Sequence, residues 1–122
     1  MNTIHITIGN DTYNATIYDT PTGKAIMEAL PFEGKISTWG GEFYIDVPVE
    51  QPLEEGAEAV VEPCDLAYWP SGPVFCVFFG KTPASTDDRP AGISPVNVFG
   101  KIEAEPETLY QYDAGTHMKV RG

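Results

Sequence analysis

Short runs with strand periodicity, separated by glycine and proline, constrain the fold of this chain more than any other feature. Residues 3–8 (TIHITI) alternate apolar and polar side chains, as a half-buried strand does. Residues 42–47 (EFYIDV) alternate in the same way, whereas residues 74–79 (VFCVFF) are continuously apolar, which is typical of a strand covered on both faces. Seven or eight such strands, without an internal repeat, are expected in the 122 residues, and their spacing predicts a closed barrel or a sandwich.

One short helix is expected from Thr20 onward. Thr20 can cap its N-terminus, and Pro21 suits the first helical position. Pro31 should end the helix, because the residue before a proline avoids the helical conformation. Residues 105–112 (EPETLYQY) can form a second, brief helix. The length and the hydrophobic fraction of 42% fit one packed domain over residues 1–122.

The tripeptide Gly-Lys-Thr at residues 80–82 matches the end of a phosphate-binding loop, but its surroundings do not fit. The first glycine of that loop would fall at Phe75, and Pro83 removes a hydrogen-bond donor where a helix should begin. We therefore interpret these residues as the exit of a strand. They open a stretch, residues 80–95, with three prolines and no periodicity, and so long a loop in a compact domain is usually functional or mobile.

The charge distribution argues against several classes of partner. The net charge is −11, and residues 36–80 contain eight acidic and no basic residues. Such a surface repels the phosphates of nucleic acids, so we expect no nucleic-acid partner. Solubility is the ordinary explanation of the charge, and a saline habitat or a basic partner are the alternatives. Neither a signal-like start nor an apolar run of membrane-spanning length occurs, so we expect no membrane association and a cytoplasmic location.

The sequence lacks the usual catalytic and metal-binding patterns. The two histidines, His5 and His117, fall on the polar faces of the first and last strands, and we expect them to be exposed rather than to bind a metal. Cys64 and Cys76 have no neighbour that would activate a thiol, so both are expected to be reduced and buried. Since no Gly-x-Ser-x-Gly motif or distinct acid–base pair is present, we expect no catalytic residue, metal or cofactor.

Aromatic residues flanked by glycine or proline are the remaining feature. They are Trp39, Tyr68, Trp69, Phe78 and Phe79. Each side chain taken singly can belong to an ordinary core. Together, beside the long loop, they can form a shallow apolar groove with a few polar groups, which suits a peptide or a small molecule.

Four segments of the chain resemble a small prokaryotic family of cyclophilin-like proteins, the minimal members of the cyclophilin fold. The resemblance covers residues 4–120. The segments are residues 20–32 (TPTGKAIMEALPF), 38–49 (TWGGEFYIDVPV), 65–83 (DLAYWPSGPVFCVFFGKTP) and 94–102 (SPVNVFGKI). The resemblance implies a mainly β fold, a closed antiparallel barrel of about eight strands with one or two short helices covering its ends.

The resemblance implies a ligand groove, whereas two departures from the cyclophilin pattern argue against efficient catalysis. Cyclophilins are peptidyl-prolyl isomerases, in which an arginine assists rotation about a bond with a barrier of about 18–20 kcal/mol beside an apolar proline pocket. In the matching strand, Cys76 stands where those enzymes place a phenylalanine of the pocket wall. Residues 38–45, where the arginine belongs, contain no basic residue. Arg121 is terminal, so Arg89 in the long loop is the candidate that could approach the groove.

The leading expectation is therefore a barrel that binds a peptide or small ligand without efficient isomerase activity. Its groove is expected to contain Trp39, Tyr44, Trp69, Cys76, Phe79, Thr82 and Asn97. Two alternatives stay open: a divergent peptidyl-prolyl isomerase, and an interaction subunit, since cyclophilin-like barrels also occur as parts of larger hydrolase assemblies. The sequence does not determine the oligomeric state.

Overall fold

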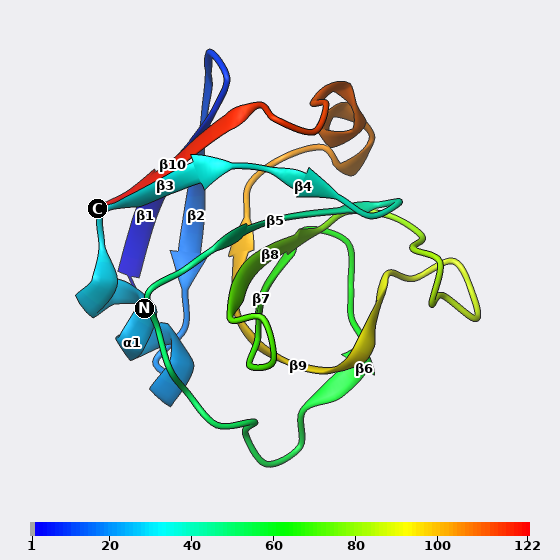
Figure 1. Ribbon diagram of the computed structural model, residues 1–122, viewed down its shortest axis with the longest axis horizontal. Coiled ribbons are helices and arrows are strands. Elements are labelled where there is room, and N and C mark those ends of the chain that lie inside the picture. The colour runs from blue at the N-terminus through cyan, green and yellow to red at the C-terminus, as the bar shows by residue number, and fades with distance from the viewer. Residues whose placement is uncertain (1) are drawn as a thin grey trace.

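A curled antiparallel sheet and two short helices make up the computed structural model, which describes residues 2–122 (Figure 1). The helices are α1 (Pro21–Ala29) and the 3-10 helix η1 (Pro106–Gln111). The strands are β1 (Asn2–Ile8), β2 (Asp11–Ile17), β3 (Phe32–Lys35), β4 (Ser37–Thr38), β5 (Glu42–Asp46), β6 (Glu58–Val60), β7 (Asp65–Trp69), β8 (Val74–Phe78), β9 (Ala91–Ile102) and β10 (His117–Arg121). The sequence predicted seven or eight strands; the two it did not predict, β3 and β4, have four and two residues and are too short to show a clear periodicity.

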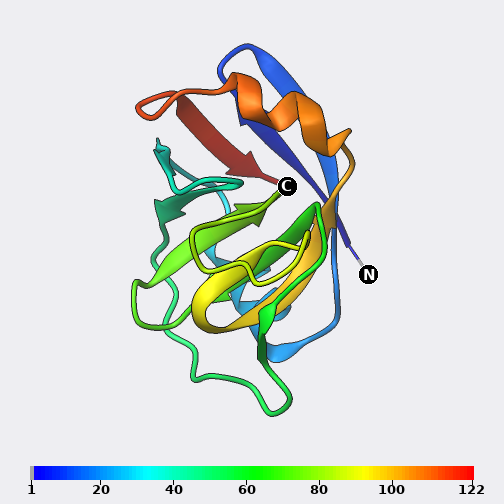
Figure 2. The ribbon, with the colours of Figure 1, turned by 90° about the vertical axis from the view of Figure 1, so that its right-hand side faces the viewer.

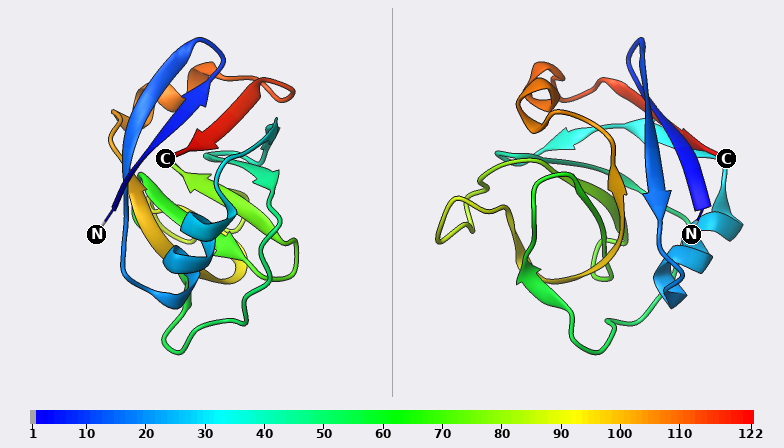
Figure 3. Two further views of the ribbon diagram at one scale, coloured as in Figure 1. Left: turned by 90° about the vertical axis from the view of Figure 1, so that its left-hand side faces the viewer. Right: turned by 180° about the vertical axis from the view of Figure 1, so that it is seen from behind.

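The order of the strands brings the two ends of the sheet together. Hydrogen-bonded neighbours run β3-β10-β1-β2-β9-β7-β8-β5-β4, with β6 paired to β9. The end strands β3 and β4 are consecutive in the chain and are separated by Ile36 alone. In the described part of the chain no ladder joins β3 to β4, so the chain itself, rather than hydrogen bonds, completes the ring seen in Figures 1 and 3. The predicted closed barrel is therefore not confirmed.

The main core fills the inside of the curled sheet. Alternate residues of β1 supply Ile4, Ile6 and Ile8, which are fully buried, so the half-buried strand predicted from TIHITI is confirmed. Phe75 from β8 meets Phe99 from β9 with ring centroids 5.3 Å apart. The helices α1 and η1 lie at opposite ends of the ring (Figures 1 and 2).

A second apolar cluster lies on the outer face of the sheet. It contains Val61, Ala67, Val74, Cys76, Phe78 and Val96, from strands β7, β8 and β9 and the end of β6. Because odd-numbered residues of β8 face the inner core and even-numbered ones face this cluster, every residue of β8 is buried. The continuous apolar run VFCVFF is thus confirmed as a strand covered on both faces.

The helix predicted after Thr20 is confirmed. The Thr20 side chain accepts a hydrogen bond from the Gly23 backbone N–H at 3.0 Å, and Pro21 occupies the first turn. The brief second helix is confirmed as η1, of the 3-10 type. No helix among residues 2–122 is long and apolar enough to cross a membrane.

The loop predicted over residues 80–95 is shorter than expected, because β9 already begins at Ala91. Glu58 pairs with Val96 while Val60 pairs with Ala91, so residues 92–95 form an extra loop, or bulge, in β9. A bulge tolerates a proline that an ordinary ladder would exclude, and this explains why Pro95 in the sequence concealed the strand.

Candidate functional site

The outer cluster surrounds a pocket of about 210 Å³, which we call the aromatic pocket. Its walls come from β5, β7, β8, the bulge of β9 and the turn before β5. The residues that line it are Trp39, Glu42, Tyr44, Trp69, Val74, Cys76, Phe78, Gly92, Ile93 and Val96. Three large aromatic side chains at the walls are half-buried, and Ile93 at the rim is 71% exposed.

Strand register produces the hollow. Tyr44 of β5 lies opposite Cys76 of β8, which lies opposite Ala67 of β7. Side chains in one such row share a face of the sheet, so a large residue stands beside two small ones. Of these residues Tyr44 and the small Cys76 line the pocket, together with Trp69 of β7.

Trp39 reaches the pocket from a glycine turn between β4 and β5. The Trp39 backbone N–H donates to the Glu42 carbonyl at 2.9 Å, and Gly40 has φ +59°, a left-handed conformation that favours glycine. Gly41 packs so closely on Gly80 that an added Cβ would lie 2.2 Å from the Gly80 carbonyl carbon. The double glycine therefore fixes the side of the pocket on which Trp39 stands.

Trp69, at the end of β7, is held to the bulge of β9. Its indole Nε1–H donates to the Ser94 hydroxyl oxygen at 2.8 Å. A buried or half-buried indole usually finds such a partner for its one polar group. The bond orients the ring as a wall of the pocket and ties that wall to the rim residue Ile93.

Glu42 is the one charged side chain in the pocket lining. It is only 6% exposed, and no lysine, arginine or histidine is among the residues that line the pocket with it. Burial raises the pKa of the Glu42 carboxyl from 4.5 to about 7, and a hydrogen bond with the neighbouring Cys76 thiol opposes part of that rise. The carboxyl therefore changes its protonation state near neutral pH.

The alternation along residues 42–47 predicted that Glu42 shares a face with Tyr44, but Glu42 was not among the residues expected in the groove. The alternation itself was correct, because Phe43 and Ile45 face the inner core and Glu42 does not. The sequence of the neighbouring strand β8 contained the evidence that Glu42 is buried. Since its apolar run predicts burial on both faces, the outer face of an adjacent strand had to be covered as well.

The thiol of Cys76 is not suited to nucleophilic chemistry. Burial, and then the adjacent Glu42 carboxyl, raises its pKa well above the ordinary value. Burial also raises the pKa of the Cys64 thiol, which donates a hydrogen bond to the Ala104 carbonyl at 3.3 Å. Both cysteines are free and buried, as predicted.

The structure brings together four of the seven residues expected in the groove: Trp39, Tyr44, Trp69 and Cys76. Phe79 does not join them. It packs in the inner core against Phe43 and Tyr110, with ring centroids 5.2 and 4.8 Å away. Phe79 lies four positions after Phe75, and residues an even number of positions apart in a strand point to the same face. The inward direction of Phe79 could therefore have been predicted from the alternation.

Thr82 and Asn97 lie outside the aromatic pocket and make structural hydrogen bonds. The Thr82 hydroxyl donates to the Ala91 carbonyl and so fastens the loop to the start of β9. The Asn97 amide group donates to the Thr22 hydroxyl and the Pro52 carbonyl, at 3.0 Å each. Its carbonyl oxygen accepts from the Glu54 backbone N–H at 2.8 Å. Asn97 thus fixes the segment before β6 against α1.

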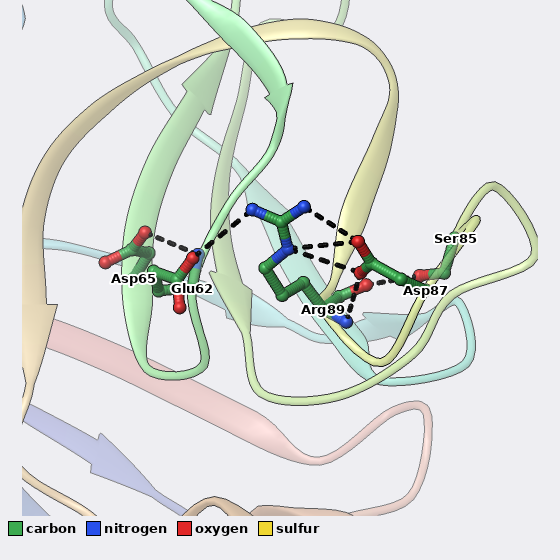
Figure 4. Close-up of polar contacts among 5 residues, drawn as sticks. All are labelled: Glu62, Asp65, Ser85, Asp87 and Arg89. Carbon is green, nitrogen blue, oxygen red and sulfur yellow. Dashed lines mark hydrogen bonds and ion pairs between the residues drawn. The ribbon is translucent and has the colours of Figure 1, made fainter.

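Arg89, the arginine that the sequence analysis considered for the groove, contacts acidic side chains outside the aromatic pocket (Figure 4). Its guanidinium binds the Asp87 carboxylate, with a shortest contact of 2.7 Å, and lies 3.9 Å from Glu62. These hydrogen bonds hold the pKa of Asp87 down at about 2. Arg89 lines a separate, acidic hollow with Glu62 and Asp65 and is not part of the aromatic pocket lining.

The histidines do not meet. His5 in β1 lies opposite Arg121, and its Nδ1 is 3.0 Å from the Asn14 side-chain oxygen. His117 Nε2 lies 2.9 Å from Glu33. Within residues 2–122, no group of three His, Cys, Asp or Glu side chains could hold a metal ion.

Comparison with known proteins identifies related folds. The family model described as "Cyclophilin-like" matches residues 2–121. The solution structure of the hypothetical protein AF2241 from Archaeoglobus fulgidus is 36% identical, with a TM-score of 0.77, over 98% of this chain and 92% of that one. McbB, solved in complex with tryptophan, is 12% identical with a TM-score of 0.71, over 97% of this chain but 44% of its own. No curated protein matches the chain.

Proposed function

The chain belongs to the cyclophilin-like family, and on that premise we propose that its aromatic pocket binds a peptide side chain or a small organic ligand without efficient prolyl isomerisation. One observation carries the proposal: half-buried Trp39, Tyr44 and Trp69 line a hollow whose other lining residues are mostly apolar. A protein site for small molecules is typically such a concave, mostly apolar surface with a few polar groups.

The size of the pocket indicates one ring or one side chain. An apolar cavity of about 150 Å³ is enough to bind benzene, and the aromatic pocket measures about 210 Å³. The exposed Ile93 at its rim would contact the part of a ligand that extends outward. McbB was solved with tryptophan bound; at 12% identity that likeness concerns the fold, so tryptophan serves only as one test ligand.

The electrostatics of the pocket argue against efficient isomerisation. Rotation about the prolyl bond is assisted by a cationic donor in cyclophilins, whereas the one charged lining residue here is the acidic Glu42. A protease-coupled assay on an Ala-Pro peptide should give equal rates with and without micromolar protein. A clear acceleration would favour the divergent isomerase instead.

Binding itself is testable by NMR titration with indole, tryptophan and short apolar peptides. The indole N–H signals of Trp39 and Trp69 should shift, and Trp39→Ala should weaken binding by about tenfold or more, as the loss of an aromatic anchor does. Leu53→Ala is a matched control, since Leu53 is 48% exposed and not in the pocket lining. Shifts confined to the acidic surface would refute the proposal.

A further inference from the structure

We propose that the ligand of the aromatic pocket is an organic cation, an amine or ammonium group on an apolar body, held by the Glu42 carboxylate and the surrounding aromatic rings. The proposal rests on the function proposed above for that pocket and adds the chemical class of the ligand. Its first support is charge. Every residue of the lining other than Glu42 is uncharged.

The second support is that Glu42 lacks a cationic partner within the described chain. No ion pair to it is found among residues 2–122, and its carboxyl is hydrogen-bonded to the neutral Cys76 thiol. A buried carboxylate without a cation is strongly disfavoured, and removal from water is best compensated by an opposite charge in direct contact. A cation brought by the ligand would supply that charge from the pocket side.

The third support is the aromatic wall. Trp39, Tyr44 and Trp69 line the same hollow as Glu42. Ammonium groups are attracted to the faces of aromatic rings, most strongly to tryptophan, and the attraction grows when water is excluded. The apolar Val74, Phe78 and Val96 would contact the hydrocarbon part of the ligand. An acid and several rings around one small hollow thus match both parts of an organic amine.

The fourth support is the electrostatic field produced by the negative charge of the chain. Residues 36–80, which supply most of the lining, contain eight acidic and no basic side chains, and the whole chain carries −11. An excess of negative charge raises the local concentration of cations and their association rate. The same field disfavours an anionic ligand.

The proposal has a protonation consequence. Because the pKa of the Glu42 carboxyl in the folded protein is about 7, an amine must hold this carboxyl in its ionised form, and below that pH its binding releases the carboxyl proton. The titratable groups that line the pocket beside Glu42 are Tyr44 on its own strand and Cys76 on β8. Amine affinity should therefore be about 30-fold weaker at pH 5.5 than at pH 8, given that value of about 7.

Three probes of similar shape separate the outcomes: 2-phenylethylamine, 2-phenylethanol and 3-phenylpropanoate. Titrations follow the Trp39 and Trp69 indole signals at about pH 8. In the unmodified protein the amine should bind about tenfold or more tighter than the alcohol, a difference of about 1.4 kcal/mol. Glu42→Gln should bring the two dissociation constants together while it retains alcohol binding.

Asp46→Asn is the matched control, because Asp46 lies on the same strand and face but is exposed and not in the lining. It makes the same change of charge and should keep the preference for the amine. If amine and alcohol bind equally to the unmodified protein, or the anion binds best, the cation proposal is wrong while the pocket stands. If no probe shifts either tryptophan, the proposed function itself fails. Should Glu42→Gln not fold, the pH dependence of amine binding decides.

Discussion

The buried Glu42 carboxyl should make the folded protein less stable as the pH rises through neutrality. Its pKa is about 7 in the fold against an ordinary value of 4.5. A raised acid pKa means that the folded state keeps a proton that the unfolded chain has already released. Stability from this group is therefore complete below about pH 4.5, is lost as the pH rises to about 7, and stays constant above that value.

The size of the loss follows from the same two values. The interval from 4.5 to about 7 corresponds to about 3 kcal/mol, at roughly 1.4 kcal/mol for each pKa unit. A domain of this size has a free energy of unfolding of about 5–15 kcal/mol, so the effect is a large part of the total. Within a practical range, from pH 5.5 to 8.5, about 2 kcal/mol of the loss should be measurable.

The assay is urea unfolding of the unmodified protein and Glu42→Gln at several pH values in that range. Glutamine resembles the protonated acid and does not titrate. The free energy of unfolding of the variant minus that of the unmodified protein should therefore grow by about 2 kcal/mol toward alkaline pH. Asp46→Asn should show no such growth. Parallel pH curves for the unmodified protein and Glu42→Gln would refute the placement of this carboxyl in a dry, apolar site.

Three further predictions concern the pocket and its supports. Cys76→Phe should fill the hollow and abolish probe binding, at a cost of about 1–3 kcal/mol for overpacking; undiminished binding in the NMR titration would place the ligand elsewhere. Asn97→Ala should lower the free energy of unfolding by about 1–3 kcal/mol, because buried hydrogen-bond partners are left unpaired, yet leave probe affinity unchanged; a loss of affinity would give Asn97 a direct part in binding. Gly41→Ala should displace the turn that carries Trp39, because its Cβ would meet the Gly80 backbone at 2.2 Å, and unshifted Trp39 signals would contradict this.

Local patterns predicted the parts of the fold that depend on neighbouring residues. The cap at Thr20, the strand from Ile4 to Ile8 and the two-sided burial of β8 each follow from a few adjacent side chains. The bulge of β9 could not be predicted, because it depends on pairing with β6, which lies more than 30 residues earlier in the chain. The short strand β3 likewise depends on pairing with β10, more than 80 residues later in the chain.

The candidate site was partly predictable for the same reason. Trp39 and Trp69 stood out as aromatic residues beside glycine or proline, and both line the pocket. Asn97 could not be assigned from sequence, since its partner Thr22 lies 75 positions away. Glu42 was not expected in the groove, since an acidic residue in an alternating strand ordinarily faces water. A rule that holds for most carboxylates therefore led the sequence analysis to overlook the one acidic group of the pocket.

Ile36 has a consequence for how the chain could be rearranged. Its backbone N–H donates to the Thr116 carbonyl, and its carbonyl accepts from the Gly115 N–H, so this residue is anchored to the turn before β10 while it connects β3 to β4. The strands β3 and β4 are already the unpaired ends of the sheet. A circular permutant opened at Ile36 would let these two edges separate, and exposed edges promote association between molecules. A permutant opened near Gly56, outside the strands, would keep the circumference continuous. The peptide bonds at one buried isoleucine therefore hold β3 beside β4, as hydrogen bonds between neighbouring strands would in a closed barrel.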